Sequence, residues 1–226
     1  MIQNYKELKT LMKTITQYLI TTVFAIMIIS CSKETKSEDK VQPATIKSIP
    51  TGDYSIANNE SKLDWVGKEI TTKIHTGTLD ILDGAIKVND DGLVKGNITI
   101  DMRSIVVTDL KGRSKEVLEG HLKSDDFFGS EIYPKAELKF ESSSKILPGD
   151  KINFNGDLII KDITNPIEFS AKVLETKPSL KAVANMTFDR SKYNVRFRSG
   201  TFFDDLGDKL ILDNIDVEVN LSAKKG

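Results

Sequence analysis

The chain contains two histidines, His75 and His121, whose side chains are the best suited to acid–base chemistry or metal binding near neutral pH. They lie far apart in the sequence without a His-Glu-x-x-His pattern or a third ligand, so the sequence predicts no metal site. Each imidazole could instead donate a hydrogen bond to a phosphate, hydroxyl or quinone oxygen of a ligand. The alternative is that each holds a turn by hydrogen bonding to the backbone.

His121 also begins a polar run that ends in two aromatic residues, His121-Leu122-Lys123-Ser124-Asp125-Asp126-Phe127-Phe128. The run places bulky rings beside a charged edge, which suits an amphiphilic ligand. Lys123, together with Arg190 and Arg196 near other aromatic residues, could hold an anionic head group. The alternative for each cation is a solvated position at a strand edge.

The remaining polar residues do not form a recognisable catalytic set. Asp125 and Asp126 stand at a predicted helix end, where a turn or capping role is typical. The sequence has no Gly-x-Ser-x-Gly stretch and no glycine-rich phosphate loop. We therefore expect a binding protein without a cofactor rather than an enzyme. The rival hypothesis is a hydrolase that uses His121 with an aspartate.

Residues 1–30 have the features of an export signal. Lys13 supplies a positive charge, Ile15 to Ile29 are mostly apolar, and Ser30 is a small residue. The ending Ile28-Ile29-Ser30-Cys31 is similar to a bacterial lipobox, which predicts cleavage before Cys31 and acylation of that cysteine. An uncleaved transmembrane anchor is the alternative, although the apolar stretch is short for a span of about 20 residues.

Cys31 is the only cysteine, so no disulfide can form within one chain. Removal of residues 1–30 takes away three lysines and one glutamate, which leaves 29 basic and 32 acidic residues. This balance lacks the basic footprint of a nucleic-acid-binding protein and gives no strong attraction to anionic lipid. We expect a cell-envelope protein held by Cys31 at the outer rather than the inner membrane, on its periplasmic or surface face.

Residues 31–50 are polar apart from a few positions and predict an acylated cysteine followed by a disordered tether. Residues 51–226 are expected to form one domain. Apolar and polar residues alternate there, as in Ile152 to Ile160 and Ile167 to Val173, which is typical of strands with one buried face. Turns are expected at Asp83-Gly84, Asp90-Asp91-Gly92, Pro148-Gly149-Asp150 and Asn165-Pro166.

About eight or nine antiparallel strands follow from this pattern, and a sheet of that size usually closes into a barrel. A barrel of about eight strands can hold one small ligand. A two-sheet sandwich is the alternative. Leu110 to Ser124 break the alternation and predict one short helix.

If the apolar face lines a barrel, its large side chains are candidates for contact with an apolar ligand. The alternative is ordinary core packing without a cavity. Because neighbours on a strand point to opposite faces, only one of Phe127 and Phe128 would face the lumen if that segment were extended. The candidates are Trp65, Phe127, Phe128, Leu138, Phe140, Phe154, Leu158, Phe169, Met186, Phe188 and Tyr193.

Several motifs, in their order and spacing, resemble the YceI-like family over nearly all of residues 52–223. Asp162 and Gly129 depart from it, since glycine and aspartate respectively are common there. The motifs are Trp65-Val66-Gly67, His75-Thr76-Gly77, Ile100 to Ile105, the His121 to Phe128 run with Tyr133-Pro134, Gly156-Asp157-Leu158 with Thr164 and Pro166, and Phe188-Asp189-Arg190 with Tyr193.

This resemblance implies a lipocalin-like barrel that binds a long isoprenoid, either a polyprenyl lipid or an isoprenoid quinone, for storage or transport. Some members of the family form homodimers. The alternatives are a carrier of a fatty acid or an amide-type apolar ligand, and a structural surface lipoprotein with a solid core.

Overall fold

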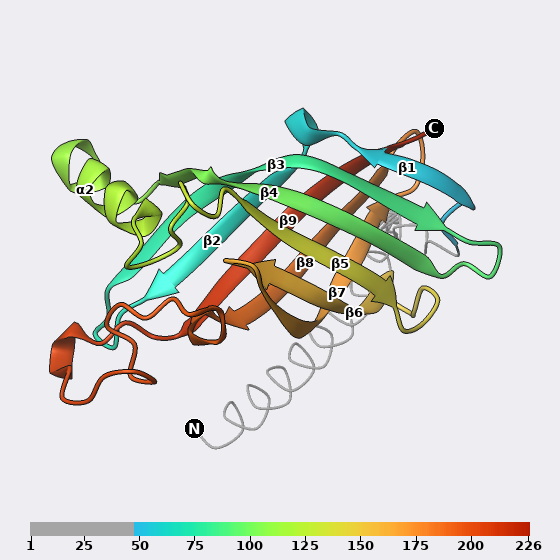
Figure 1. Ribbon diagram of the computed structural model, residues 1–226. Helices are drawn as coiled ribbons and strands as arrows, with labels where there is room; N and C mark the ends of the chain where they lie inside the picture. The colour runs from blue at the N-terminus through green and yellow to red at the C-terminus, as the bar shows by residue number, and fades with distance from the viewer. Residues whose placement is uncertain (1–47) are drawn as a thin grey trace, which may run out of the picture. The chain divides into compact units, whose positions relative to one another are not determined.

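Nine antiparallel strands form one sheet in residues 48–226, the part of the chain that the computed structural model describes (Figure 1). The single α-helix of this part lies between the fourth and fifth strands. The elements are β1 (Gly52–Ile56), β2 (Lys62–Lys68), β3 (Ile74–Val88), β4 (Val94–Val107), α2 (Gly112–Lys123), β5 (Lys135–Ser142), β6 (Lys151–Ile160), β7 (Ile163–Glu175), β8 (Leu180–Asp189) and β9 (Asn214–Lys225).

The sheet closes into a barrel because β3 pairs with β4 as well as with β2. Both β1 and β2 lie between β3 and β9, where β1 pairs with the Ala85–Val88 end of β3 and β2 with its Ile74–Leu79 end. They are successive pieces of one strand position, so the barrel has eight positions. The predicted antiparallel barrel of about eight strands is confirmed, and the sandwich alternative is wrong.

Two expected turns are wrong. Asp83-Gly84 lies inside β3, where the register against β4 shifts and Asp83 Oδ1 accepts a 2.8 Å hydrogen bond from the Gly84 N–H. The pair forms a bulge in a continuous strand, not a hairpin. Asp90-Asp91-Gly92 and Pro148-Gly149-Asp150 do separate strands, as expected.

Asn165-Pro166 lies inside β7, opposite Leu158 and Asp157 of β6. The chain reverses earlier, at Lys161 and Asp162, which both have positive φ. Pro166 is tolerated because β7 pairs with β8 only from Ser170 onward, so no partner strand needs the missing N–H.

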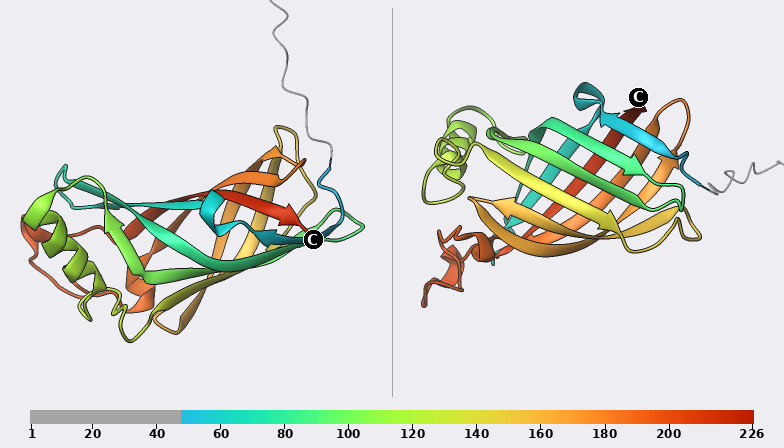
Figure 2. Two further views of the ribbon diagram at one scale, coloured as in Figure 1. Left: turned by 90° about the horizontal axis from the view of Figure 1, so that it is seen from above. Right: turned by 45° about the vertical axis from the view of Figure 1, so that its right-hand side comes forward.

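The predicted helix is confirmed as α2, slightly shorter than expected. Leu122 is buried and Leu118 packs against the core, whereas Val117 is 55% exposed. The helix lies at one end of the barrel together with the long β8–β9 loop, and β1 and the C-terminus lie at the other end (Figure 2).

The end of the barrel near β1 is filled by three phenylalanines. Phe154 and Phe169 stack with ring centroids 5.1 Å apart, and Phe140 meets Phe154 edge-on at 5.3 Å. Phe140 lies between Gly96 of β4 and Gly156 of β6 in register, and a Cβ at Gly96 would come within 2.5 Å of its Cζ. Glycine at position 96 therefore makes room for the ring, and glycine at position 156 lets the β6 backbone lie close to that of β5. We call Phe140, Phe154 and Phe169 the floor.

No helix within residues 48–226 is long and apolar enough to span a membrane. The predicted signal, Cys31 and most of the tether lie outside the described residues.

Candidate ligand-binding site

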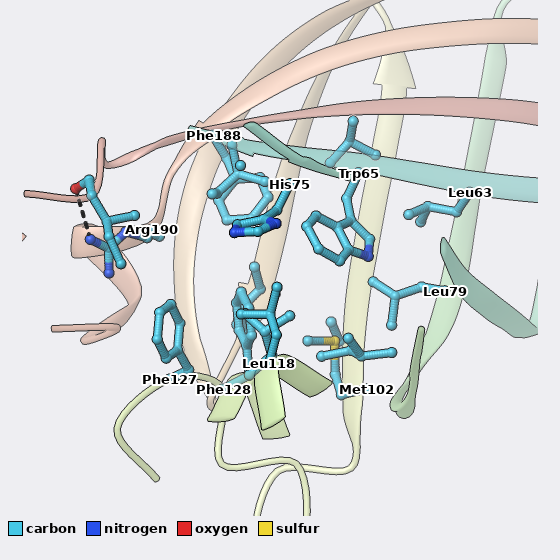
Figure 3. Close-up of a pocket in the computed structure, with 18 of the residues that line it drawn as sticks. Leu63, Trp65, His75, Leu79, Met102, Leu118, Phe127, Phe128, Phe188 and Arg190 are labelled. Atoms are coloured by element: carbon cyan, nitrogen blue, oxygen red, sulfur yellow. Dashed lines mark hydrogen bonds between the residues drawn. The ribbon is translucent and has the colours of Figure 1, made fainter. Parts of the chain in front are cut away.

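The half of the barrel next to α2 encloses a cavity of about 710 Å³, a volume typical of small-molecule sites, which span roughly 300–1,000 Å³. Its walls are mainly apolar and include Leu63, Leu79, Met102 and Leu118 (Figure 3). The alternating pattern puts one apolar face of each strand inside, and the barrel closes around it. This cavity contradicts the solid-core alternative.

The cavity reaches polar side chains at the α2 end of the barrel. These are Lys73, His75, Arg113, His121 and Arg198, which we call the mouth. They come from β3, from α2 and from the loops that join β2 to β3 and β8 to β9. An apolar chamber with a polar mouth can accept a ligand with an apolar tail and a polar end.

The floor lines a smaller cavity of about 70 Å³ near β1, and none of its three rings lines the main cavity. Four residues line both cavities: Ile98, Leu138, Met186 and Val219. Of the aromatic and aliphatic candidates, Trp65, Phe127, Phe128, Leu138, Leu158, Met186 and Phe188 line the main cavity, whereas Phe140, Phe154 and Phe169 line the smaller one.

Tyr193 lines neither cavity. It is buried behind Phe188, with the two rings perpendicular and their centroids 5.7 Å apart. Burial, helped by the charge of Asp189, raises the pKa of Tyr193 to about 12. Its place is in the wall and not at the ligand surface.

Phe127 and Phe128 both line the main cavity. The segment is not extended but forms a turn after α2. In this turn the Phe127 N–H donates to the Ser124 carbonyl and the Phe128 N–H donates to the Leu122 carbonyl. The strand rule that would have turned one ring outward therefore does not apply here.

His121 packs within an aromatic cluster at the mouth. Its ring lies edge-on to Phe197 at 4.2 Å and to Phe127 at 4.9 Å between centroids. Phe197 was not among the residues predicted from the sequence, because it lies in the β8–β9 loop outside any alternating run. The one sequence feature that could have suggested Phe197 is its position between two arginines, Arg196 and Arg198. The guanidinium carbon of Arg198 lies over the Phe197 ring, 5.0 Å from its centroid.

His75 is held by a carboxylate that the sequence analysis also missed. Its Nδ1 lies 2.8 Å from Asp109 Oδ2, and Asp109 Oδ1 accepts a 2.9 Å hydrogen bond from the Thr76 N–H. Burial works to raise the pKa of Asp109, but the hydrogen bonds from Thr76 and His75 outweigh it and lower that pKa. With Nδ1–H donated to Asp109, Nε2 is the nitrogen left to meet a ligand.

Arg190 lines the cavity, but its guanidinium is engaged in the fold. The residue is 0% exposed, and it donates to the backbone carbonyls of Val195, Ile211 and Leu212. Its Nη2 also lies 3.1 Å from Asp213 Oδ1. Burial lowers the pKa of Arg190 more than Asp213 and Asp189 raise it. Arg190 thus ties together the two ends of the β8–β9 loop.

The other cations proposed for a head group lie elsewhere. Lys123 and Arg196 do not line the cavity, and Arg196 instead lies over the Phe202 ring at 4.8 Å. His75, His121 and Arg190 are the head-group candidates that the fold does bring to the cavity. Within residues 48–226, no three histidine, cysteine, aspartate or glutamate side chains are grouped as metal ligands.

Known proteins are similar to this chain in sequence or in fold. A UPF0312 protein of Staphylococcus aureus strain USA300 is 28% identical over 155 residues, which cover 64% of this chain and 82% of that protein. The crystal structure of BcnA from Burkholderia cenocepacia matches with a TM-score of 0.57 and 22% identity, over 75% of this chain and 99% of that one. A polyisoprenoid binding domain from Saccharophagus degradans, implicated in plant cell wall breakdown, matches with a TM-score of 0.54 and 16% identity, over 76% and 98%.

At 22% and 16% sequence identity, these two structural matches show a shared fold. The sequence itself matches the model of the YceI-like domain from residue 54 to residue 223, which is most of the chain. The protein therefore belongs to the YceI-like domain family.

Proposed function

We propose that the protein binds a long isoprenoid, a polyprenyl lipid or an isoprenoid quinone, inside the barrel and stores or carries it at a membrane. The observation that carries this proposal is the apolar cavity of about 710 Å³ with polar groups gathered at one end. The domain from Saccharophagus degradans is described as binding polyisoprenoids, which supports the same class of ligand here.

The energetics favour a branched apolar tail. At about 0.8 kcal/mol per buried methylene, one five-carbon unit gains roughly 3–4 kcal/mol before ordering costs. Ordering the chain takes back part of that gain. Burial of a few units would still give tight binding without strong contacts to the head group, which fits a cavity with mainly apolar walls. Its charged side chains are those of the mouth, Lys68, Glu69 and Arg190.

We further propose that acylated Cys31 anchors the protein in the cell envelope, at the outer membrane. Ile49, near the start of the described chain, lines the smaller cavity, so the chain enters the barrel at the end opposite the mouth. The 16 residues from 32 to 47 could extend to at most about 55 Å. Since the 14 residues of β4 measure about 46 Å along the strand, a tether of that length would let the mouth turn toward the membrane.

Mass spectrometry of bound lipid tests the ligand. The full chain is purified, extracted with organic solvent and analysed. We expect an isoprenoid in stoichiometric amount. A fatty acid or an amide would favour the alternative cargo, and an empty extract after incubation with polyprenyl lipids and quinones would contradict the proposal.

Labelling with a fatty acid tests the anchor. The unaltered chain should incorporate a labelled fatty acid in cells, and Cys31→Ser should incorporate none. Equal labelling of the two proteins would contradict acylation at Cys31.

A further inference from the structure

The indole of Trp65 carries a buried hydrogen-bond donor without an acceptor. Trp65 is 9% exposed, it lines the main cavity, and its Nε1 is shielded from solvent with no hydrogen-bond partner. Buried polar groups in native proteins nearly always have partners, so such an exception needs an explanation.

The fold fixes the position of this indole. Trp65 of β2 stands directly opposite Gly77 of β3, and a Cβ at Gly77 would overlap the ring. The absence of that Cβ lets the indole lie against β3 inside the barrel. In Figure 3 the nitrogen is on the edge of the ring that faces Leu79, away from His75.

Nε1 makes no hydrogen bond, although the backbone carbonyl of Val106 also lies close to Gly77 beside the indole. Leu63, Leu79 and Met102 line this part of the cavity with carbon and sulfur atoms. A phenylalanine would fill the same wall without leaving a donor unpaired. The tryptophan is therefore explained best by a partner that arrives with the ligand.

Within residues 48–226, two other buried side-chain atoms are also without a hydrogen bond, Ser144 Oγ and Asp213 Oδ1. Asp213 Oδ1 lies at ion-pair distance from Arg190, and Ser144 lies in the β5–β6 hairpin and lines neither interior cavity. Of these three unpaired atoms, Trp65 Nε1 is the one whose residue lines the main cavity.

We propose that the ligand carries an acceptor oxygen, of the ketone or quinone carbonyl class, that binds Trp65 Nε1–H. This inference rests on the proposed function and narrows it, because a plain hydrocarbon or a polyprenyl chain whose only oxygen lies at the mouth would leave the donor unpaired. His75 pairs in register with Gly67, two residues nearer the mouth than Trp65. The carbonyl thus lies one layer inside the mouth, and the tail extends past Leu63 and Leu79 to the floor.

Nuclear magnetic resonance gives a direct test, because Trp65 is the only tryptophan and the full chain has one indole N–H resonance. The probes are farnesylacetone and the hydrocarbon in which a methylene replaces its carbonyl. We expect the indole proton of the ¹⁵N-labelled full chain to move downfield with farnesylacetone and to stay near its starting position with the hydrocarbon. This measurement needs no variant.

Affinities of variants give the second readout. Trp65→Phe keeps an aromatic ring over Gly77 and should weaken farnesylacetone binding about tenfold, as expected for one hydrogen bond to a buried donor, and hydrocarbon binding less than twofold. Phe128→Leu is the matched control, because it trims a wall without a donor and should weaken both probes alike.

The outcomes separate the two proposals. If both probes bind but move the resonance equally, or if Trp65→Phe weakens both equally, the carbonyl inference is wrong and the apolar carrier stands. If neither probe binds the unaltered protein, the proposed function fails and the inference fails with it.

Discussion

His75 of the mouth is held by Asp109, whose Oδ2 lies 2.8 Å from Nδ1 of the imidazole across 34 residues of sequence. His75 is in β3, and Asp109 is in the link between β4 and α2. The same carboxylate accepts the Thr76 N–H, so it holds both the ring and the backbone of β3. The pair therefore fixes which imidazole nitrogen can meet a ligand.

Asp109→Asn should destabilise the protein by about 1 kcal/mol at neutral pH, because it loses a charge-assisted hydrogen bond. The native pKa of Asp109 is lowered, so its stabilising effect is complete above the unfolded pKa of about 3.9 and is lost as the pH falls through the lower native value. The difference in free energy of unfolding between the two proteins should therefore be present at neutral pH and shrink toward pH 3. Urea unfolding at several pH values measures it.

Asp53→Asn is the control for this titration, because Asp53 is highly exposed and lies 4.0 Å from Lys87. Its effect on unfolding should be small at every pH. If Asp109→Asn lowers the free energy of unfolding as much at pH 3 as at pH 7, the charge of this carboxylate is not what stabilises the mouth.

The sequence predicts the barrel well because alternation is a local signal. Each of β4, β5 and β6 has an apolar face that can be read from its own residues. The Asp83-Gly84 pair shows the limit: the same two residues fit a hairpin or a bulge, and the choice depends on β4, which keeps pairing on both sides of them. Turn residues specify a local bend but not its partner strand.

Gly77→Ala should cost about 1–3 kcal/mol of stability, as expected for overpacking in a tight site. A Cβ at this position would overlap both the Trp65 indole and the backbone carbonyl of Val106. Gly67→Ala is the matched control in the neighbouring strand, because its Cβ would lie at an ordinary contact distance of 3.8 Å from the Ile215 side chain. Urea denaturation should separate the two variants, and equal midpoints would show that Trp65 does not need the missing Cβ.

The floor should limit the length of ligand that the barrel accepts. Phe140→Leu removes part of the ring that lies between Gly96 and Gly156, and this change should enlarge the smaller cavity, which shares four lining residues with the main one. We expect the variant to retain longer polyprenols than the unaltered protein, at some cost in stability. Mass spectrometry after incubation with a polyprenol mixture measures the longest chain retained.

Phe128→Leu is the comparison for length selection, since Phe128 lines the main cavity at the α2 end and not at the floor. This variant should change affinity without changing the longest chain retained. If Phe140→Leu and Phe128→Leu shift the length limit equally, the floor does not set it.

The site itself is harder to predict than the barrel, because its parts meet only in the folded chain. Phe197 belongs to an irregular loop, and its contact with His121 spans 76 residues of sequence. Arg190 is the opposite case: its position near aromatic residues suggested a free cation, yet its hydrogen bonds go to carbonyls of the loop that follows. Neither arrangement has a local sequence signature.

Arg190→Ala should be the most damaging of these substitutions, with a loss of about 3–5 kcal/mol, because it removes the ion-pair partner of Asp213 and leaves three backbone carbonyls without their donor. Arg190→Lys should not restore stability, since an ammonium cannot reach Val195, Ile211 and Leu212 in the way that the planar guanidinium does. Arg196→Ala, at an exposed position over Phe202, should change stability little.

Hydrogen exchange should show faster exchange in residues 195–212 of both Arg190 variants. Because Phe197 and Arg198 of this loop line the cavity, the same variants should release bound lipid faster; unchanged exchange with unchanged release would mean that the loop is held by other contacts.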